Sequence, residues 1–433
     1  ILAAAVLRAK GHTVSLFDTM FVQSPDEVLP KLKEFKPDYL VIYDDGFNYL
    51  TKMCLTNMRE AAWQMSEYAH QHGCKVIVSS SDSTDHFEKY LQHKADVIIL
   101  GEGEETLSQL IDNFTVNDSV NGTAYHKEGA PVKTAARPLM KNKSDLPLPA
   151  WDLLDIEAYR SMWLSRWGYL SLNVATTRGC PYKCNWCAKP IYGNAYTMRT
   201  PQHVVSEIKL LKEKYNFDHI WFCDDIFGMR RNWVIEFAEL VQRENLKFRY
   251  KIQSRADLLV QEKYVEALAA SGCESVWMGA ESGSQRILDA MDKGTTIAQI
   301  KEANRLLKQY GIKPAFFLQF GYLGETIEDI KQTIELLNEC LPDDIGASVS
   351  YPLPGTGFYE KVKSDLKDKT NWTDSDELAL MFSNTYPREF YKQLHRYVHK
   401  NFRLHQCYES IGKLLTNPTG INYSNLRRAA AIG

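Results

Sequence analysis

The sequence has no long apolar run, no excess of charge of either sign and no dense set of cysteines. No stretch of its 433 residues approaches the roughly 18 consecutive apolar residues that a membrane helix needs. Its 51 basic and 54 acidic side chains give a formal charge of −3, so neither a nucleic-acid partner nor a membrane partner is expected. Nine cysteines, mostly scattered, do not resemble the dense, even sets of secreted disulfide frameworks. We therefore expect a cytoplasmic globular protein.

Strand-like and helix-like stretches alternate over the first 115 residues. The expected strands are 14–17, 39–43, 75–78 and 96–100, and the expected helices are 25–35, 58–72, 86–94 and 104–114. Apolar strands separated by amphipathic helices predict a parallel sheet covered on both faces, which is a doubly wound, Rossmann-like α/β domain. A hairpin turning at Glu128-Gly129 follows. Because the chain opens on helix-like residues, we expect a first strand to precede Ile1.

A second alternation of strands and helices predicts a partial (β/α)6 barrel, short of the eight units of a closed one. Its expected strands are 170–175, 219–223, 248–253, 275–278, 315–320 and 347–351. We expect four regions: the Rossmann-like domain (1–145), a proline-containing linker (146–168), the partial barrel (169–365) and a helical C-terminal region (366–433).

Three cysteines stand close together directly after the first barrel strand. Cys180, Cys184 and Cys187 have C-x3-C-x2-C spacing. Thiolates are the ligands that iron–sulfur clusters require, and a missing fourth cysteine leaves one iron open for a small molecule. The alternative is structural zinc, which normally has four protein ligands. No second cysteine pair or nearby histidine is present, so the spacing favours a cluster.

The segment 178–187 resembles the radical S-adenosylmethionine (SAM) superfamily, including Trp186 before the third cysteine. The resemblance implies that Cys180, Cys184 and Cys187 are metal-binding and catalytic. They would bind a 4Fe–4S cluster whose open iron chelates SAM. One electron then cleaves SAM to a 5′-deoxyadenosyl radical that abstracts hydrogen from an unactivated carbon. It also implies an electron donor such as flavodoxin or ferredoxin.

Segments at the ends of the later barrel strands are also similar to that superfamily. Carboxyl ends of barrel strands form the active face of such a fold. The resemblance implies that SAM is contacted there by Trp186, Asp225, Ser254, Arg255, Glu281 and Gly321. Singly, each has a structural alternative, such as a solvated turn for 224–225 or a helix cap for Glu281.

The order of a doubly wound domain before this barrel is similar to the cobalamin-binding class of the superfamily. Two segments, 76–84 and 95–106, carry that resemblance. The expected cobalamin contacts within them are Ser79, Ser80, Ser81, Gly101, Glu102 and Gly103. The serines depart from the Gly-Gly common in relatives. The Asp-x-His-x-x-Gly motif for a lower axial histidine is absent from these residues. The alternative is a domain kept for stability or substrate docking.

The leading functional hypothesis is methylation of an unactivated carbon of a small molecule, by a radical SAM enzyme that uses cobalamin. The first alternative is oxidation or ring formation, as in the oxidative cyclase class with the same domain order. The second is a transfer-RNA methylthiotransferase. That class needs three N-terminal cysteines, whereas this region has only Cys54 and Cys74. The third is a scaffold without chemistry, which the intact cysteine triplet opposes.

Overall fold

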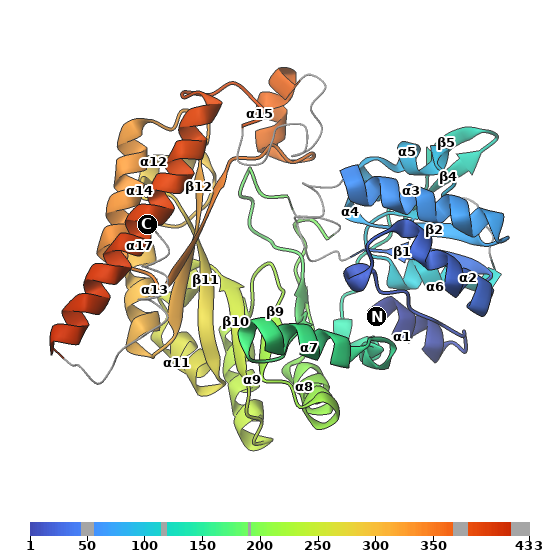
Figure 1. Cartoon of the computed structure of the whole chain (residues 1–433), viewed down its shortest axis with the longest axis horizontal. Coiled ribbons are helices and arrows are strands. Elements are labelled where there is room, and N and C mark those ends of the chain that lie inside the picture. Colours follow the sequence, from blue (N-terminus) through green and yellow to red (C-terminus); the bar gives the residue numbers. More distant parts are fainter. Residues whose placement is uncertain (45–55, 114–118, 189–191, 367–379, 417–433) are drawn as a thin grey trace. The chain divides into compact units, whose positions relative to one another are not determined.

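The fold comes from a computed structural model, which describes residues 1–44, 56–113, 119–188, 192–366 and 380–416. These residues form two compact units. The first comprises the described residues of 1–181, 188–219 and 223–225, and the second those of 182–187, 220–222 and 226–416. Figure 1 shows the elements of each unit along the chain.

A five-stranded sheet organises the N-terminal part of the first unit, with the order β1-β2-β3-β4-β5. Strands β1, β2 and β3 are parallel, whereas β4 and β5 form an antiparallel hairpin. The strands are β1 (Tyr39–Tyr43), β2 (Lys75–Ser79), β3 (Val97–Ile99), β4 (Thr123–Lys127) and β5 (Ala130–Lys133). The helices are α1 (Leu2–Ala9), α2 (Val28–Phe35), α3 (Thr56–Gln71), α4 (Ser81–Asp85), α5 (Phe87–Gln92) and α6 (Glu104–Asn113).

Both faces of this sheet are buried, as a doubly wound fold requires. Val76 and Val78 of β2 pack into one apolar cluster with α2, α3 and α5. Ile77, between them, points into a second cluster with α1 and α6. Alternate residues of one strand therefore meet different layers of helices, which explains why β2 is apolar throughout.

The expected strand at 14–17 is wrong, since residues 12–18 form neither helix nor strand. Val14 packs against one apolar cluster of the sheet and Phe17 against the other. The apolar pattern therefore reports burial of these side chains against the clusters and not pairing of the backbone.

The second sheet has six strands in the order β13-β12-β11-β10-β9-β6. Its strands are β6 (Ser171–Val174), β9 (His219–Phe222), β10 (Arg249–Ser254), β11 (Cys273–Glu281), β12 (Lys313–Phe320) and β13 (Asp344–Val349). The pairings from β10 to β13 are parallel. Each strand lies within a few residues of its expected position, which confirms the expected strands and their assembly into one sheet. A separate two-stranded ribbon joins β7 (Thr177–Arg178) to β8 (Thr197–Met198).

Helices connect these strands and continue beyond them. They are α7 (Ile156–Trp167), α8 (Pro201–Tyr215), α9 (Arg231–Arg243), α10 (Ala256–Leu259), α11 (Glu262–Ala270), α12 (Gln285–Ala290), α13 (Ile297–Gln309), α14 (Ile327–Cys340), α15 (Gly357–Leu366) and α17 (Arg388–Thr416). Helix α17, red in Figure 1, packs against α14 and β13 of the second unit. This long helix confirms the helical C-terminal region, while residues 367–379 and 417–433 lie outside the described part.

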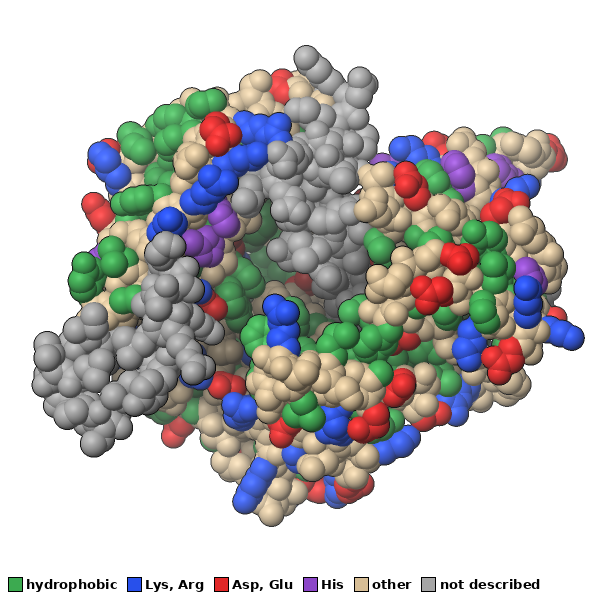
Figure 2. Space-filling view, viewed as in Figure 1, with side chains coloured by type: hydrophobic (Ala, Val, Ile, Leu, Met, Phe, Trp, Pro, Cys, Tyr) green, Lys and Arg blue, Asp and Glu red, His purple; other side chains and the backbone are tan. Residues whose placement is uncertain are grey.

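The surface of the first unit carries charges of both signs. Acidic and basic side chains lie interspersed on its face in Figure 2, as the near-zero formal charge leads one to expect. No helix among the described residues combines the length and the apolar character that crossing a membrane requires.

Candidate functional site

The residues expected to contact cobalamin gather at one edge of the first sheet. Tyr43, the last residue of β1, pairs with Ser79 of β2, and Ser79 pairs with Ile99 of β3. Parallel strands place their carboxyl ends side by side, so Ser79–Ser81 and Gly101–Gly103 follow neighbouring strands at this edge. In a doubly wound fold this is the edge where ligands bind.

Several of these residues have partners within the protein. The Ser80 hydroxyl accepts a hydrogen bond from the Ser83 backbone N–H at 2.8 Å and caps helix α4. Gly103 lies so close to the Tyr43 ring that a Cβ at this position would be 2.5 Å from the Tyr43 hydroxyl oxygen. Local packing therefore explains Gly103, and capping explains Ser80, without any ligand.

Glu102 belongs to a buried set of four charges, which we call the buried charge cluster: Arg178, Lys143, Glu102 and Glu104. Glu102 accepts hydrogen bonds from the Lys143 ammonium and, at 2.8 Å, from the Met140 backbone N–H. Burial opposes its charge, but these hydrogen bonds outweigh burial and lower its pKa. Glu102 thus stays ionised, and both oxygens of its carboxylate already accept hydrogen bonds from the protein.

Arg178 links this cluster to the first cysteine. Its guanidinium donates to Glu102 at 2.6 Å and makes two bonds to Glu104, at 2.5 and 3.0 Å. Gly179 follows with φ of +75°, and a Cβ there would lie 2.1 Å from the Ala195 carbonyl oxygen. Only glycine fits this position. Cys180 then donates its backbone N–H to the Gly193 carbonyl at 3.4 Å, and its side chain is buried.

Two cations interact with Cys184 in the second unit. The Arg255 Nη1 donates toward Cys184 Sγ at 3.8 Å, and the Arg255 guanidinium stacks 3.6 Å from the centre of the Tyr182 ring. Lys293 is the second cation. Burial opposes its charge, but Glu281 and Cys184 outweigh burial and raise its pKa.

Asn185, between the second and third cysteines, fixes the backbone of the loop. Its N–H donates to the Met291 carbonyl at 3.0 Å, and its carbonyl accepts from the Phe358 N–H at 2.8 Å. Its side-chain oxygen accepts from the Tyr322 hydroxyl at 2.7 Å. The sequence reasoning missed Asn185, and its position between two motif cysteines was the available signal.

Glu281 stands at the end of β11 with a φ of +61°, which non-glycine residues adopt rarely. Its carboxylate accepts from Lys293 Nζ at 2.7 Å, and both side chains are buried. A Cβ on Gly279 would lie 2.5 Å from both charged atoms, so that glycine leaves room for the pair. Lys293, which sequence reasoning also missed, is the structural partner of Glu281.

The remaining residues expected to contact SAM lie in different surroundings. Within the part of the chain that the structure describes, neither the buried Ser254 hydroxyl at the end of β10 nor the buried Trp186 indole N–H has a hydrogen-bond partner. Gly321 follows β12 with φ of +74° and donates its N–H to Glu325 at 2.6 Å. Asp225 is exposed, whereas its neighbour Asp224 is buried.

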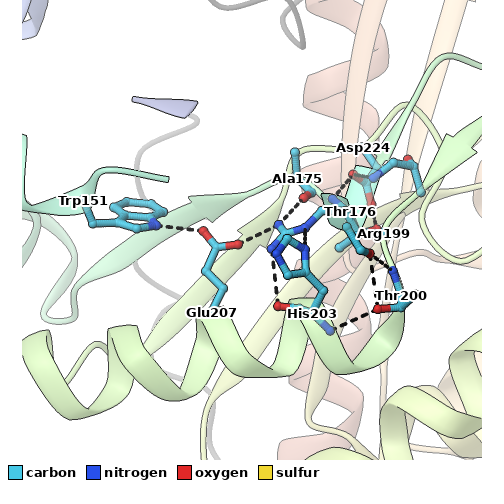
Figure 3. Close-up of polar contacts among 10 residues, drawn as sticks. Trp151, Ala175, Thr176, Arg199, Thr200, His203, Glu207 and Asp224 are labelled. Atoms are coloured by element: carbon cyan, nitrogen blue, oxygen red, sulfur yellow. Dashed lines mark hydrogen bonds and ion pairs between the residues drawn. The ribbon is translucent and has the colours of Figure 1, made fainter. Parts of the chain in front are cut away.

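Asp224 belongs to a polar network in the first unit (Figure 3). It accepts hydrogen bonds from the backbone N–H groups of Thr176 at 2.7 Å and Thr177 at 2.9 Å. Burial raises its pKa to about 6, although these hydrogen bonds oppose the shift. The same figure shows Arg199 held by Glu207, with N and O 2.6 Å apart. The network borders a cavity of about 350 Å³, a size typical of small-molecule sites.

The predicted cluster ligands are divided between the two units, with Cys180 in the first and Cys184 and Cys187 in the second. None of the three forms a disulfide. No three His, Cys, Asp or Glu side chains of the described ranges are placed to bind a metal ion. Chain continuity nevertheless keeps Cys180 and Cys184 within reach, since four residues span at most about 14 Å.

A family model decides what this arrangement is. The model of the radical SAM superfamily matches residues 174–337, which includes the cysteine loop and strands β9 to β12. Residues 174–337 of this chain are thus similar to the radical SAM superfamily.

Two curated relatives are named as a methyltransferase and a cyclase. An uncharacterized methyltransferase of Pyrococcus horikoshii is 28% identical over 282 residues, covering 64% of this chain and 60% of the relative. The anaerobic magnesium-protoporphyrin IX monomethyl ester cyclase of Rubrivivax gelatinosus is 27% identical over 376 residues, covering 83% of this chain and 65% of the relative. This chain thus spans less than two thirds of either protein.

A solved structure shares the fold over both sheets. The radical SAM methyltransferase TsrM from Kitasatospora setae, with cobalamin and a [4Fe–4S] cluster bound, matches with a TM-score of 0.72. The match is 17% identical and covers 86% of this chain and 75% of TsrM. At this identity the likeness establishes the fold, which is the predicted combination of a Rossmann-like domain, a partial barrel and a helical C-terminal region.

Proposed function

We propose that this radical SAM enzyme binds a 4Fe–4S cluster through Cys180, Cys184 and Cys187 and uses SAM and cobalamin to methylate an unactivated carbon of a small molecule. The observation that carries the proposal is the spacing of the three cysteines inside the segment that the radical SAM family model matches. Thiolates are the ligands that such a cluster requires, and the Arg255 guanidinium lies 3.8 Å from the Cys184 sulfur.

The donor set fits such a cluster. Three cysteines without disulfide partners, on a loop fixed by Gly179 and Asn185, supply three ligands and leave one iron open. When bound, the cluster supplies the electron that cleaves SAM. The protein's own residues hold the loop and supply positive charge.

The environment of the SAM candidates supports a bound ligand. The Ser254 hydroxyl and the Trp186 indole N–H are buried without hydrogen-bond partners among the described residues, and such groups cost free energy unless something binds them. Arg255 follows Ser254 directly and already contacts Cys184. We propose that Ser254, Arg255 and Trp186 contact SAM, together with Glu281, Gly321 and Asp225.

Cobalamin is proposed as the second cofactor of the first unit. Support comes from the small residues Ser79, Ser81 and Gly101 at the ligand-binding edge of the sheet, and from the cobalamin bound in TsrM. The Glu102 carboxylate is occupied by the buried charge cluster, so we expect any corrin contact in that turn to come from the backbone.

Ring formation is the second candidate reaction, because one relative is named as a cyclase. The electron donor is proposed to be a flavodoxin or ferredoxin type of protein, and the location the cytoplasm. The four regions with boundaries at 145, 168 and 365 remain the proposed domain organisation.

The test uses anaerobically reconstituted protein with cobalamin, a chemical reductant and SAM labelled with deuterium in its methyl group. We expect 5′-deoxyadenosine to form and the bound corrin fraction to gain three deuterium atoms. Formation of 5′-deoxyadenosine without label in the corrin would favour the cyclase type of reaction. A protein that neither retains cobalamin nor cleaves SAM would contradict the proposed function.

A further inference from the structure

We propose that Arg178 is a positioning residue for Cys180, held in place by the carboxylates of Glu102 and Glu104. The inference rests on the proposed function, because it takes Cys180 to be a cluster ligand. It assigns to the Gly-Glu-Gly-Glu turn after β3 a role in the cluster site that its resemblance to cobalamin-binding proteins does not suggest.

The Arg178 guanidinium is held from two directions. Glu104, the first residue of α6, accepts hydrogen bonds from both terminal nitrogens of Arg178, at 2.5 and 3.0 Å. Glu102 accepts a hydrogen bond from one of them at 2.6 Å. Two-pronged bonds of this kind fix orientation as well as distance. The Tyr192 ring, whose centre lies 5.0 Å from the guanidinium carbon, is a third neighbour. Arg178 therefore has little freedom to move.

The charges of the cluster balance. Arg178 and Lys143 carry two positive charges, and Glu102 and Glu104 carry two negative ones. Each side chain is at most 7% exposed. At such burial a missing partner leaves an unpaired charge that water cannot reach. The arrangement is consequently stable only when all four groups are present, or when a cation and an anion are removed together.

The backbone carries this constraint to Cys180. Arg178 pairs with Thr197 in the β7–β8 ribbon, and only Gly179 separates it from Cys180. Gly179 packs against the Ala195 carbonyl, and Cys180 donates its N–H to Gly193. Because ribbon contacts lie on both sides of this peptide, a shift of Arg178 is expected to displace the Cys180 sulfur.

A contribution to folding alone would give a similar contact list, so the experiment separates the two roles. Arg178→Met leaves a net negative charge buried, whereas the double variant Arg178→Met with Glu104→Met restores the balance while the anchor stays absent. Arg59→Met is the matched control. Arg59 makes a buried two-pronged ion pair with Asp82, at 2.6 and 2.8 Å in the same unit, without any recorded contact to the ribbon.

The readouts are the urea unfolding midpoint, the iron and acid-labile sulfide per chain after anaerobic reconstitution, and the electron paramagnetic resonance spectrum of the reduced protein. We expect Arg178→Met to lose at least half of its iron and to show an altered spectrum. The double variant should regain most of the midpoint but keep the low iron and the altered spectrum. Arg59→Met should lose stability and retain the wild-type spectrum.

Two results would overturn the inference. In the first, the double variant recovers both iron content and spectrum along with its midpoint, so that Arg178 acts through folding alone. In the second, Arg178→Met and Arg59→Met behave alike at equal folded fraction. A wild-type chain that assembles no cluster would instead remove the proposed function itself, and with it the basis of this inference.

Discussion

Arg255 directs an N–H at the sulfur of Cys184 from 3.8 Å. The same side chain stacks on Tyr182 and donates at 2.9 Å to Asp257 and at 2.8 Å to the Lys293 carbonyl. An arginine fixed by this many partners presents its charge to the cysteine loop in one orientation. The end of β10 is thereby joined to the loop that is proposed to bind the cluster.

Replacing Arg255 is expected to weaken SAM binding. A hydrogen bond to a charged group contributes about 1.5–3 kcal/mol, so Arg255→Met should lower SAM affinity by roughly 10-fold to 100-fold. Arg255→Lys keeps the positive charge but lacks the planar guanidinium, so its SAM affinity should lie between those of the wild type and Arg255→Met. Equilibrium dialysis with reconstituted protein measures the effect. The control is Arg249→Met, an exposed arginine at the start of β10, the strand that Arg255 follows, and equal losses in both variants would contradict this role.

Gly179→Ala should destabilise the protein more than Gly168→Ala. Both glycines have φ of +75°, but a Cβ on Gly179 would lie 2.1 Å from a carbonyl oxygen, whereas nothing lies within 4 Å of one on Gly168. Gly168→Ala therefore bears only the conformational cost, about 1 kcal/mol, and Gly179→Ala adds a steric clash. Urea unfolding of the two variants gives the comparison, and equal midpoints would show that the ribbon yields without cost.

Glu325 predicts a pH dependence of stability. Burial raises its pKa to about 8 from an ordinary value of 4.5, although the Gly321 N–H opposes the shift. The folded chain therefore holds a proton that the unfolded chain releases, and stability falls as the pH rises from about 4.5 to about 8. Glu325→Gln stays neutral, so its free energy of unfolding should rise relative to that of the wild type as the pH increases over this range, by at most about 5 kcal/mol.

Urea unfolding at pH 5 and pH 8.5 tests this expectation. The matched control is Glu328→Gln, which changes an exposed carboxylate in the first turn of α14, the helix that follows Glu325. A stability difference between Glu325→Gln and the wild type that is the same at both pH values would contradict the buried proton. The buried proton would also be contradicted if the stability difference between Glu328→Gln and the wild type grew with pH by the same amount.

Removing one partner of the Glu281–Lys293 pair should be costly. Glu281→Gln leaves a buried ammonium without its carboxylate, and breaking a pair of this kind costs about 3–5 kcal/mol. Lys301→Gln is the control, because its ion pair with Glu339 is exposed and such pairs contribute at most about 1 kcal/mol. Chemical denaturation compares the two, and similar midpoints would show that the buried ammonium finds another partner.

The sequence predicted elements better than side-chain partners. The six strands of the second sheet follow from apolar runs at regular spacing, and the cysteine loop follows from spacing alone. The strand expected at 14–17 failed because Val14 and Phe17 pack against apolar clusters without pairing. An apolar pattern reports burial and does not by itself report a partner strand.

Partners from distant segments could not be predicted from local pattern. Arg178 bonds to Glu102 and Glu104, which lie more than 70 residues away in the sequence. Glu281 faces Lys293 from a position with a positive φ, next to an irregularity in the pairing of β11, and neither feature can be read from the sequence. Adjacent residues were equally ambiguous, because Asp224 and Asp225 follow one strand and yet only the first is buried. Which of two neighbours faces inward depends on how the strand ends, and packing decides that.

Metal and sulfide analysis of the chain reconstituted without oxygen shows whether Cys180, Cys184 and Cys187 bind an iron–sulfur cluster. We expect about four iron and four sulfide per chain, lost in Cys184→Ala and retained in Cys340→Ala, a buried cysteine away from the loop. Zinc in place of iron, an absence of sulfide, or unchanged content in Cys184→Ala would contradict this expectation.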